Sequence, residues 1–156
     1  MEPVWPFIYP VGFFDGATQG RLGGAGFRIM LSEIHSFDGW IGIDDSTNNL
    51  SELVAAWACL FWANKLGIGD IQIFGDSWVV IDLINLKTKI HSIFLQHWYK
   101  RIRDILPLFS YTSFNNIFRE HNIEVDRLSK RGLGYKMGTL YFEELSGTTV
   151  SRNDNI

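Results

Sequence analysis

The chain has 156 residues, 46% hydrophobic and 15% aromatic, which is typical of one globular domain and excludes a disordered chain. No apolar run reaches the roughly 18 residues that a membrane helix needs, and the first ten residues lack the features of a signal peptide. The single cysteine, Cys59, excludes an internal disulfide, and the net charge of −3 disfavours binding to nucleic acid through charge alone.

Three strands are predicted before the first helix. Apolar runs bounded by turn residues indicate strands at 7–16, 23–31 and 33–43, with glycine-containing turns between them. Consecutive strands joined by short turns pair antiparallel, so these three are expected to form a meander.

Apolar residues then recur at helical spacing. Leu50, Leu53 and Trp57 follow the i, i+3, i+7 pattern, and alanines occupy much of the remaining surface. Such a helix is apolar nearly all round, which predicts a central position in the domain. Asn48 or Asn49 is expected to cap its start.

Strands and helices alternate in the rest of the domain. The predicted elements are a strand at 70–76, helices at 78–86 and 90–106, a strand at 109–118 and a helix at 121–131. This order predicts an α/β fold in which helices cover a mixed sheet. We expect a lead-in at residues 1–9, one domain at 10–132, and a partly disordered C-terminal tail at 133–156.

Four carboxylates lie next to apolar stretches: Asp15, Glu52, Asp76 and Asp126. Acids rarely occur there unless they are paired, protonated or bound to a cation. Because clustered carboxylates repel one another, a shared divalent metal would stabilise them, and Mg²⁺ prefers carboxylate oxygens.

Each acid also fits an ordinary structural role. These roles are a turn residue (Asp15), the last residue of a capping box (Glu52), a helix N-cap (Asp76) and an i,i+4 partner of a lysine (Asp126). Spacing alone does not decide between the two sets of roles.

Four stretches of the chain resemble the ribonuclease H family: FFDGA…GGAGF, STNNLSELVAAWACL, IFGDSWVVI and FREHNIEVDRLSKRG. They are most similar to the ribonuclease H-like, reverse transcriptase-like domains of plants that derive from retroelements. The resemblance covers about residues 10 to 132, with the motifs in family order and at family spacing. It implies a five-stranded mixed sheet of order 3-2-1-4-5, with strands 1 to 3 antiparallel and helices on both sides.

The resemblance also implies an activity. Such a domain is a metal-dependent endoribonuclease that cleaves the RNA strand of an RNA–DNA hybrid. Asp15, Glu52, Asp76 and Asp126 would bind two Mg²⁺ or Mn²⁺ ions, with Asp15 bridging them. The implied protein is intracellular, in the cytoplasm or the nucleus, with no membrane partner.

Further positions match residues of the family that contact the hybrid. Asn48 and Asn49 would meet its minor groove, where amides can bond with 2′-hydroxyls. Gly16 would let the RNA approach the backbone closely. Arg119 and Asn122 match an arginine-and-asparagine pattern of the plant domains.

The chain departs from the family at one position. Many ribonucleases H carry an assisting histidine ten residues before the final aspartate, where this chain has Asn116. The alternative function is therefore a degenerate or domesticated domain that binds nucleic acid or a protein without cleavage. We expect a monomer that is either a separate product or a piece of a retroelement polyprotein.

Overall fold

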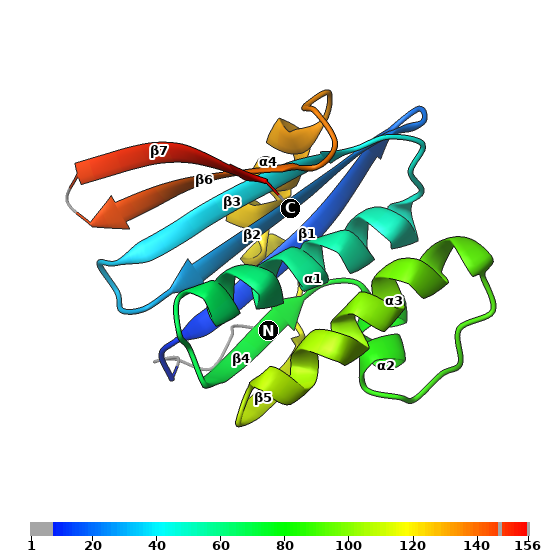
Figure 1. The fold of residues 1–156 in the computed structure, drawn as a ribbon, viewed down its shortest axis with the longest axis horizontal. Coiled ribbons are helices and arrows are strands. Elements are labelled where there is room, and N and C mark those ends of the chain that lie inside the picture. Colours follow the sequence, from blue (N-terminus) through cyan, green and yellow to red (C-terminus); the bar gives the residue numbers. More distant parts are fainter. Residues whose placement is uncertain (1–7, 147, 156) are drawn as a thin grey trace.

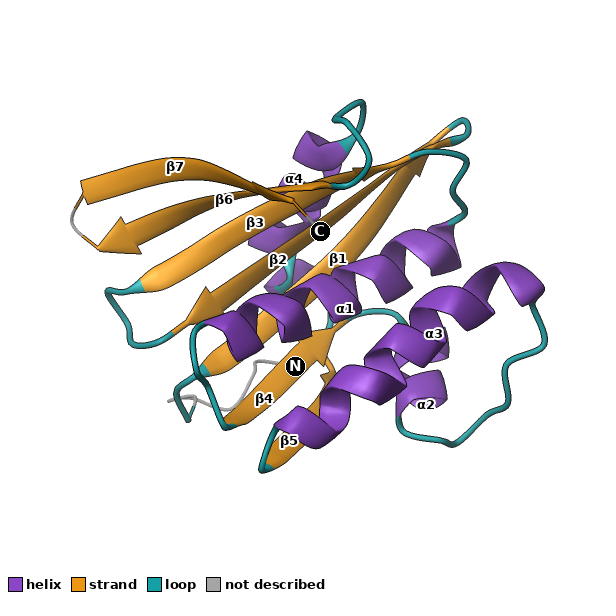
Figure 2. Ribbon diagram, viewed as in Figure 1, coloured by secondary structure: helices purple, strands orange, loops and turns teal. Residues whose placement is uncertain are grey.

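The computed structural model describes residues 8–146 and the backbone of residues 148–155. Within them, one sheet has the strand order β5-β4-β1-β2-β3-β6-β7 (Figure 2). The strands are β1 (Val11–Gln19), β2 (Leu22–Met30), β3 (Ser36–Ile43), β4 (Asp70–Gly75), β5 (Tyr111–Asn116), β6 (Thr139–Ser146) and β7 (Thr148–Asn155). The helices are α1 (Asn48–Lys65), α2 (Trp78–Ile84), α3 (Ile93–Ile105) and α4 (Ile123–Gly132), with 3₁₀ turns η1 (Leu106–Leu108) and η2 (Arg119–His121).

The first five strands lie in the predicted relative order, with β1, β2 and β3 antiparallel and both β4 and β5 parallel to β1. The prediction that the sheet ends there is wrong. β6 pairs antiparallel with β3, and β7 pairs antiparallel with β6. The segment after Gly132, expected to be a tail, thus lengthens the sheet because Leu140 and Phe142 of β6 bury their side chains in the core. Of the predicted lead-in, residues 1–7 lie outside the described residues.

Helices cover the sheet on both faces (Figure 1). α1 packs on β1 and β2, and α3 packs beside α1 (Figure 1). Residues of α3, including Trp98 and Ile102, join the same buried cluster as α1. This arrangement confirms the central position predicted for α1, because the sheet and α3 bury it from two sides.

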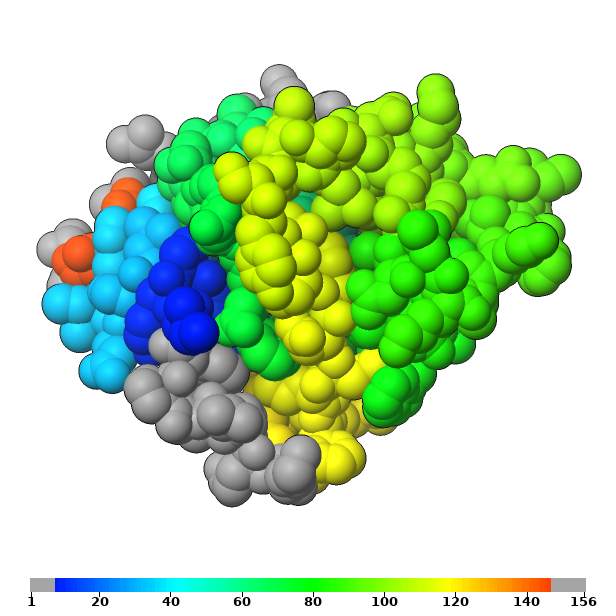
Figure 3. Space-filling view, turned by 90° about the horizontal axis from the view of Figure 1, so that it is seen from below, coloured from blue at the N-terminus to red at the C-terminus, as the bar shows by residue number. Residues whose placement is uncertain are grey.

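One edge of the sheet is formed by β5. Seen from below, its segment (yellow) lies on the surface between the segment of α2 and the start of β1 (Figure 3).

No helix in the described part of the chain is long and apolar enough to cross a membrane.

The glycines of β2 and β3 allow α4 to lie directly on the opposite face of the sheet. A Cβ atom at Gly24 would lie 2.0 Å from the Ser129 carbonyl oxygen, and one at Gly26 would lie 2.5 Å from the Ser129 nitrogen. A Cβ atom at Gly42 would lie 3.0 Å from the carbonyl oxygen of Gly132, the last residue of α4. These distances leave no room for any side chain. An added Cβ atom would overlap backbone atoms of the neighbouring segment, and a closely packed interior can relieve such an overlap only if the backbone moves. The glycine-rich stretch is therefore a packing surface rather than only a hairpin.

We expect Gly26→Ala to lower the free energy of unfolding by about 1–3 kcal/mol, because the added methyl group displaces α4 from the sheet. Urea denaturation measures this change. Gly69→Ala is the matched control, since the nearest atom to its Cβ would be the Ser110 Oγ at 3.8 Å. Equal losses in the two variants would contradict close packing at Gly26.

Candidate metal centre

The carboxyl ends of β1 and β4 separate from each other. The two strands pair from Val11 to Phe13 on β1 and from Gln72 to Phe74 on β4. Asp15 and Asp76 each lie two residues beyond the last paired position. A crevice beyond the carboxyl ends of parallel strands is a common place for ligands in α/β folds. The strand predicted to end at residue 16 continues to Gln19, because β2 pairs with β1 along its whole length, so Asp15 lies inside β1.

Three carboxylates converge in this crevice. Asp15, Glu52 and Asp76 each offer an oxygen, and these oxygens lie within 4.8 Å of one another. The Asp15 side chain is buried, with 4% exposure, and the other two are partly buried. Oxygen ligands at this spacing are suited to a hard divalent cation such as Mg²⁺.

Glu52 reaches the cluster because α1 passes close to Gly16. A Cβ atom at Gly16 would lie 2.4 Å from the Glu52 backbone nitrogen. The Gly16 N–H donates a hydrogen bond to the Glu52 Oε1 at 2.9 Å. In the structure, therefore, the missing side chain of Gly16 makes room for the helix that carries Glu52.

Burial and mutual repulsion make these acids hold their protons. Burial, followed by the negative charges of Asp76 and Asp126, raises the pKa of Asp15 to about 7. Burial, followed by the charges of Asp15 and Asp76, raises the pKa of Glu52 to about 10. A divalent cation would favour the ionised forms of these groups by supplying the missing positive charge.

Asp76 has a more favourable environment. Burial raises its pKa, but a hydrogen bond from Asn122 and the positive charge of Arg119 oppose that rise. The anionic form of Asp76 therefore receives support from an amide and a guanidinium group of this chain.

Asp126 adjoins the cluster from α4. It lies close enough to Asp15 to raise that residue's pKa through its charge and a hydrogen bond. It also forms the ion pair expected with Lys130, with 2.9 Å between Nζ and Oδ2. The ion pair expected for Asp126 is therefore confirmed, whereas its role as a metal ligand stays a prediction.

The capping roles considered for Glu52 and Asp76 are not observed. Thr47 is the N-cap of α1, and Ser77 is the N-cap of α2. Their hydroxyl oxygens accept hydrogen bonds from backbone N–H groups of the first turn of each helix, at 3.2 Å and 3.4 Å respectively. Both acidic side chains are thus available for the cluster.

The prediction that Asn48 or Asn49 caps α1 is wrong, because Thr47 takes that position. Both asparagines lie exposed in the first turn of the helix. The Asn48 Oδ1 accepts a hydrogen bond from the Thr18 hydroxyl at the end of β1. This contact places polar groups of α1 and β1 side by side at the surface near the cluster.

Arg119 and Asn122 differ sharply in accessibility. Arg119 is exposed in η2. Asn122 is 2% exposed, and its Nδ2 donates a hydrogen bond to the Phe14 carbonyl oxygen at 3.1 Å. The side chain predicted to contact nucleic acid is therefore buried, and no local sequence signal distinguishes it from an exposed residue at a helix start.

Asn116, at the position where the family resemblance leads us to expect a histidine, ends β5 opposite Gly75. Its side-chain nitrogen and oxygen are buried and have no hydrogen-bond partner among the described residues. The chain thus has an amide, which does not titrate, at this position beside the crevice.

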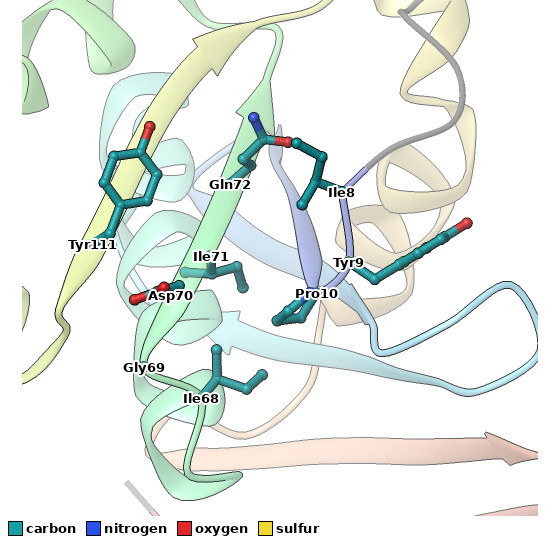
Figure 4. A pocket seen from close by; sticks show the side chains of 9 residues that line it. All are labelled: Ile8, Tyr9, Pro10, Ile68, Gly69, Asp70, Ile71, Gln72 and Tyr111. Carbon is teal, nitrogen blue, oxygen red and sulfur yellow. The ribbon is translucent and has the colours of Figure 1, made fainter.

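A cavity of about 720 Å³ lies at the other end of the parallel strands (Figure 4). Pro10, Ile71, Gln72 and Tyr111 are among the residues that line it. Its one carboxylate, from Asp70, is at the start of β4, whereas Asp76 follows the end of the same strand. The cavity and the acid cluster are therefore separate.

The fold and the acid cluster together define an α/β domain of the ribonuclease H class, and solved structures share this fold. Ribonuclease H1 from the archaeon Halobacterium salinarum is 26% identical with a TM-score of 0.72, over 78% of this chain and 95% of that one. The N-terminal ribonuclease H domain of Rv2228c from Mycobacterium tuberculosis is 23% identical with a TM-score of 0.71, over 78% and 91%. LC11-RNase H1, solved in complex with an RNA/DNA hybrid, is 21% identical with a TM-score of 0.69, over 79% and 95%.

A family described as reverse transcriptase-like matches residues 13–132. The chain therefore belongs to the reverse transcriptase-like family, and its place in the ribonuclease H family is confirmed. No curated protein matches the sequence significantly.

We expect the stability of the metal-free protein to fall as the pH rises. Asp15 and Glu52 bind protons more tightly in the folded protein than in the unfolded chain, where their pKa values are 3.8 and 4.5. The contribution of each group to the free energy of unfolding therefore has its maximum below the pKa of the unfolded chain. It is lost as the pH rises through the pKa of the folded protein, which is about 7 for Asp15 and about 10 for Glu52. Urea denaturation in EDTA at about pH 5 and about pH 9 measures the loss.

Glu52→Gln should reduce this loss, because the amide keeps an acceptor for the Gly16 N–H and carries no charge. Glu120→Gln, a change to an exposed acid outside the cluster, is the control. Added Mg²⁺ should stabilise the wild-type protein at the higher pH by binding the folded state. An unchanged pH dependence in Glu52→Gln would contradict the proton binding assigned to this residue.

Proposed function

We propose that this domain is a divalent-metal-dependent endoribonuclease that cleaves the RNA strand of RNA–DNA hybrids. The observation that carries the proposal is the convergence of Asp15, Glu52 and Asp76, with oxygens within 4.8 Å of one another. The family match and the similarity to an archaeal ribonuclease H1 support it. A structural neighbour solved with an RNA/DNA hybrid supports the choice of substrate class.

The proposed cofactors are two Mg²⁺ or Mn²⁺ ions. Glu52 and Asp76 would complete the site of one ion, Asp126 would complete the site of the other, and Asp15 would contact both. Bound in this way, such ions activate water and stabilise the leaving oxygen of a phosphodiester. The raised pKa values of Asp15 and Glu52 in the metal-free protein mean that binding is coupled to proton release.

The hybrid would lie across the start of α1 and the end of β1. Asn48 and Asn49 are exposed there, and their amides can both donate to and accept from 2′-hydroxyls in the minor groove. Gly16 is assigned no contact with the RNA, because the space left by its missing side chain is taken by α1. The contacts of the two asparagines recognise the shape and sugars of the hybrid, which suits a chain whose net charge is −3.

Arg119 would bind a phosphate on the Asp76 side of the crevice. It is exposed, and its charge acts on Asp76. A guanidinium group can form paired hydrogen bonds with a phosphate and remains charged at every physiological pH. Because Asn116 supplies no proton-transfer group, turnover should be slower than in relatives with the histidine.

The second candidate function is binding of nucleic acid or of a protein without cleavage. The amide at Asn116 is the observation that favours it. We propose in either case that the domain acts as a monomer inside the cell, as a separate protein or as part of a retroelement polyprotein.

We expect the purified protein to cut the RNA strand of a labelled RNA–DNA hybrid only when Mg²⁺ or Mn²⁺ is present. Asp76→Asn should abolish this cutting, because it removes a charged ligand from the cluster. Asp70→Asn is the matched control, since Asp70 is an exposed acid at the other end of the same strand. Binding of the hybrid by the folded wild-type protein without cutting would support the second candidate function instead.

Arg119→Ala should weaken hybrid binding at every sequence and reduce the slope of log affinity against log salt by about 1, as expected for the loss of one phosphate contact. Fluorescence anisotropy with a labelled hybrid at several salt concentrations measures both effects. Lys100→Ala, which removes an exposed positive charge from α3, is the control. An equal decrease in both variants would show that only the overall charge matters.

A further inference from the structure

The side chain of Asn122 contacts β1 at the point where β1 and β4 separate beside the acid cluster. The strands pair only as far as Phe13 and Phe74. The Phe14 carbonyl oxygen lies one residue beyond this point, and it accepts a hydrogen bond from the Asn122 Nδ2 at 3.1 Å. A side chain from the start of α4 thus continues the contact between strands where the ladder stops.

The same amide group also contacts the acid on the second strand. Asn122 lies close enough to Asp76 for its amide to act on that carboxylate. An amide nitrogen carries two N–H donors, so one can bind Phe14 and the other can bind Asp76. Because Phe14 directly precedes Asp15, one side chain connects the segments that carry two members of the cluster.

Asn122 makes these contacts at a local cost. It is the N-cap residue of α4, where asparagine usually accepts a hydrogen bond from the first turn, but its side chain caps no N–H group of the helix. Its Oδ1 is buried with no hydrogen-bond partner among the described residues. A buried acceptor without a partner is unfavourable, so neither a capping role nor a general packing role accounts for an asparagine here.

We propose that Asn122 is a positioning residue that holds Asp76 at the correct distance and orientation from Asp15 for a divalent cation. This inference rests on the proposed metal-dependent function and assigns to Asn122 a role other than nucleic-acid contact. Its burial, with 2% exposure, keeps it from touching a hybrid at the surface. Residues that orient metal ligands in this way typically change metal affinity or activity by about 10–100-fold when they are replaced.

Asn122→Ser tests the proposal without removing helix capping. Serine is a good N-cap residue and can cap α4, but its short hydroxyl cannot donate to both Phe14 and Asp76. Ile71→Val is the structural control, because it makes a mild truncation in the buried part of β4 away from the acids. The Mg²⁺ and Mn²⁺ affinities of all three folded proteins are measured by calorimetry, and kcat and KM are measured with a labelled hybrid.

We expect Asn122→Ser to bind the metal about 10–100-fold more weakly, with a lower kcat, an unchanged KM for the hybrid and recovery of activity at high Mn²⁺. Ile71→Val should match the wild type in metal affinity. Wild-type metal affinity in Asn122→Ser would overturn the inference and leave the proposed function intact, and so would a raised KM alone. If the wild-type protein binds no divalent metal, both the proposed function and this inference fail.

Discussion

Two helices approach the sheet closely at glycine positions of its strands, and this close approach determines where the acids of this domain lie. α1 reaches β1 because Gly16 offers no Cβ atom, and α4 reaches β2 because Gly24 and Gly26 offer none. Glu52 and Asp126 are thereby brought to Asp15 from opposite faces of the sheet. The positions of the acids therefore depend on the glycines, since larger residues in the strands would move both helices away from the crevice.

That geometry opposes stability in the metal-free protein. Burial and like charges raise the pKa values of Asp15 and Glu52, so the cluster holds protons that would be released from the unfolded chain near neutral pH. The apolar environment of α1, buried between the sheet and α3, supplies the opposing stabilisation. Functional sites commonly contain destabilising groups that a rigid core holds in place, because activity requires arrangements of charged groups that lower the stability of the fold.

The neighbours of Asp76 distinguish this site from a simple group of acids. Arg119 contributes charge from the surface, and Asn122 contributes a buried amide from the interior. Asn116 adds a buried amide beside the end of β4. These residues lie within seven positions, from the end of β5 to the start of α4, so one short segment supplies the polar neighbours of Asp76.

The sequence by itself determined the elements whose signals are local. The periodic apolar residues of α1 and the strands β1 to β5 could be predicted, and the resemblance of four motifs pointed to the same acids that the structure gathers. Tertiary structure alone decided the rest. β6 escaped prediction because it is defined by pairing with β3, about a hundred positions earlier in the chain. The role of Asn122 depends on a carbonyl group 108 positions away. Neither contact leaves a mark in the local sequence, because hydrogen bonds between distant segments are made by ordinary residues whose partners exist only after the chain has folded.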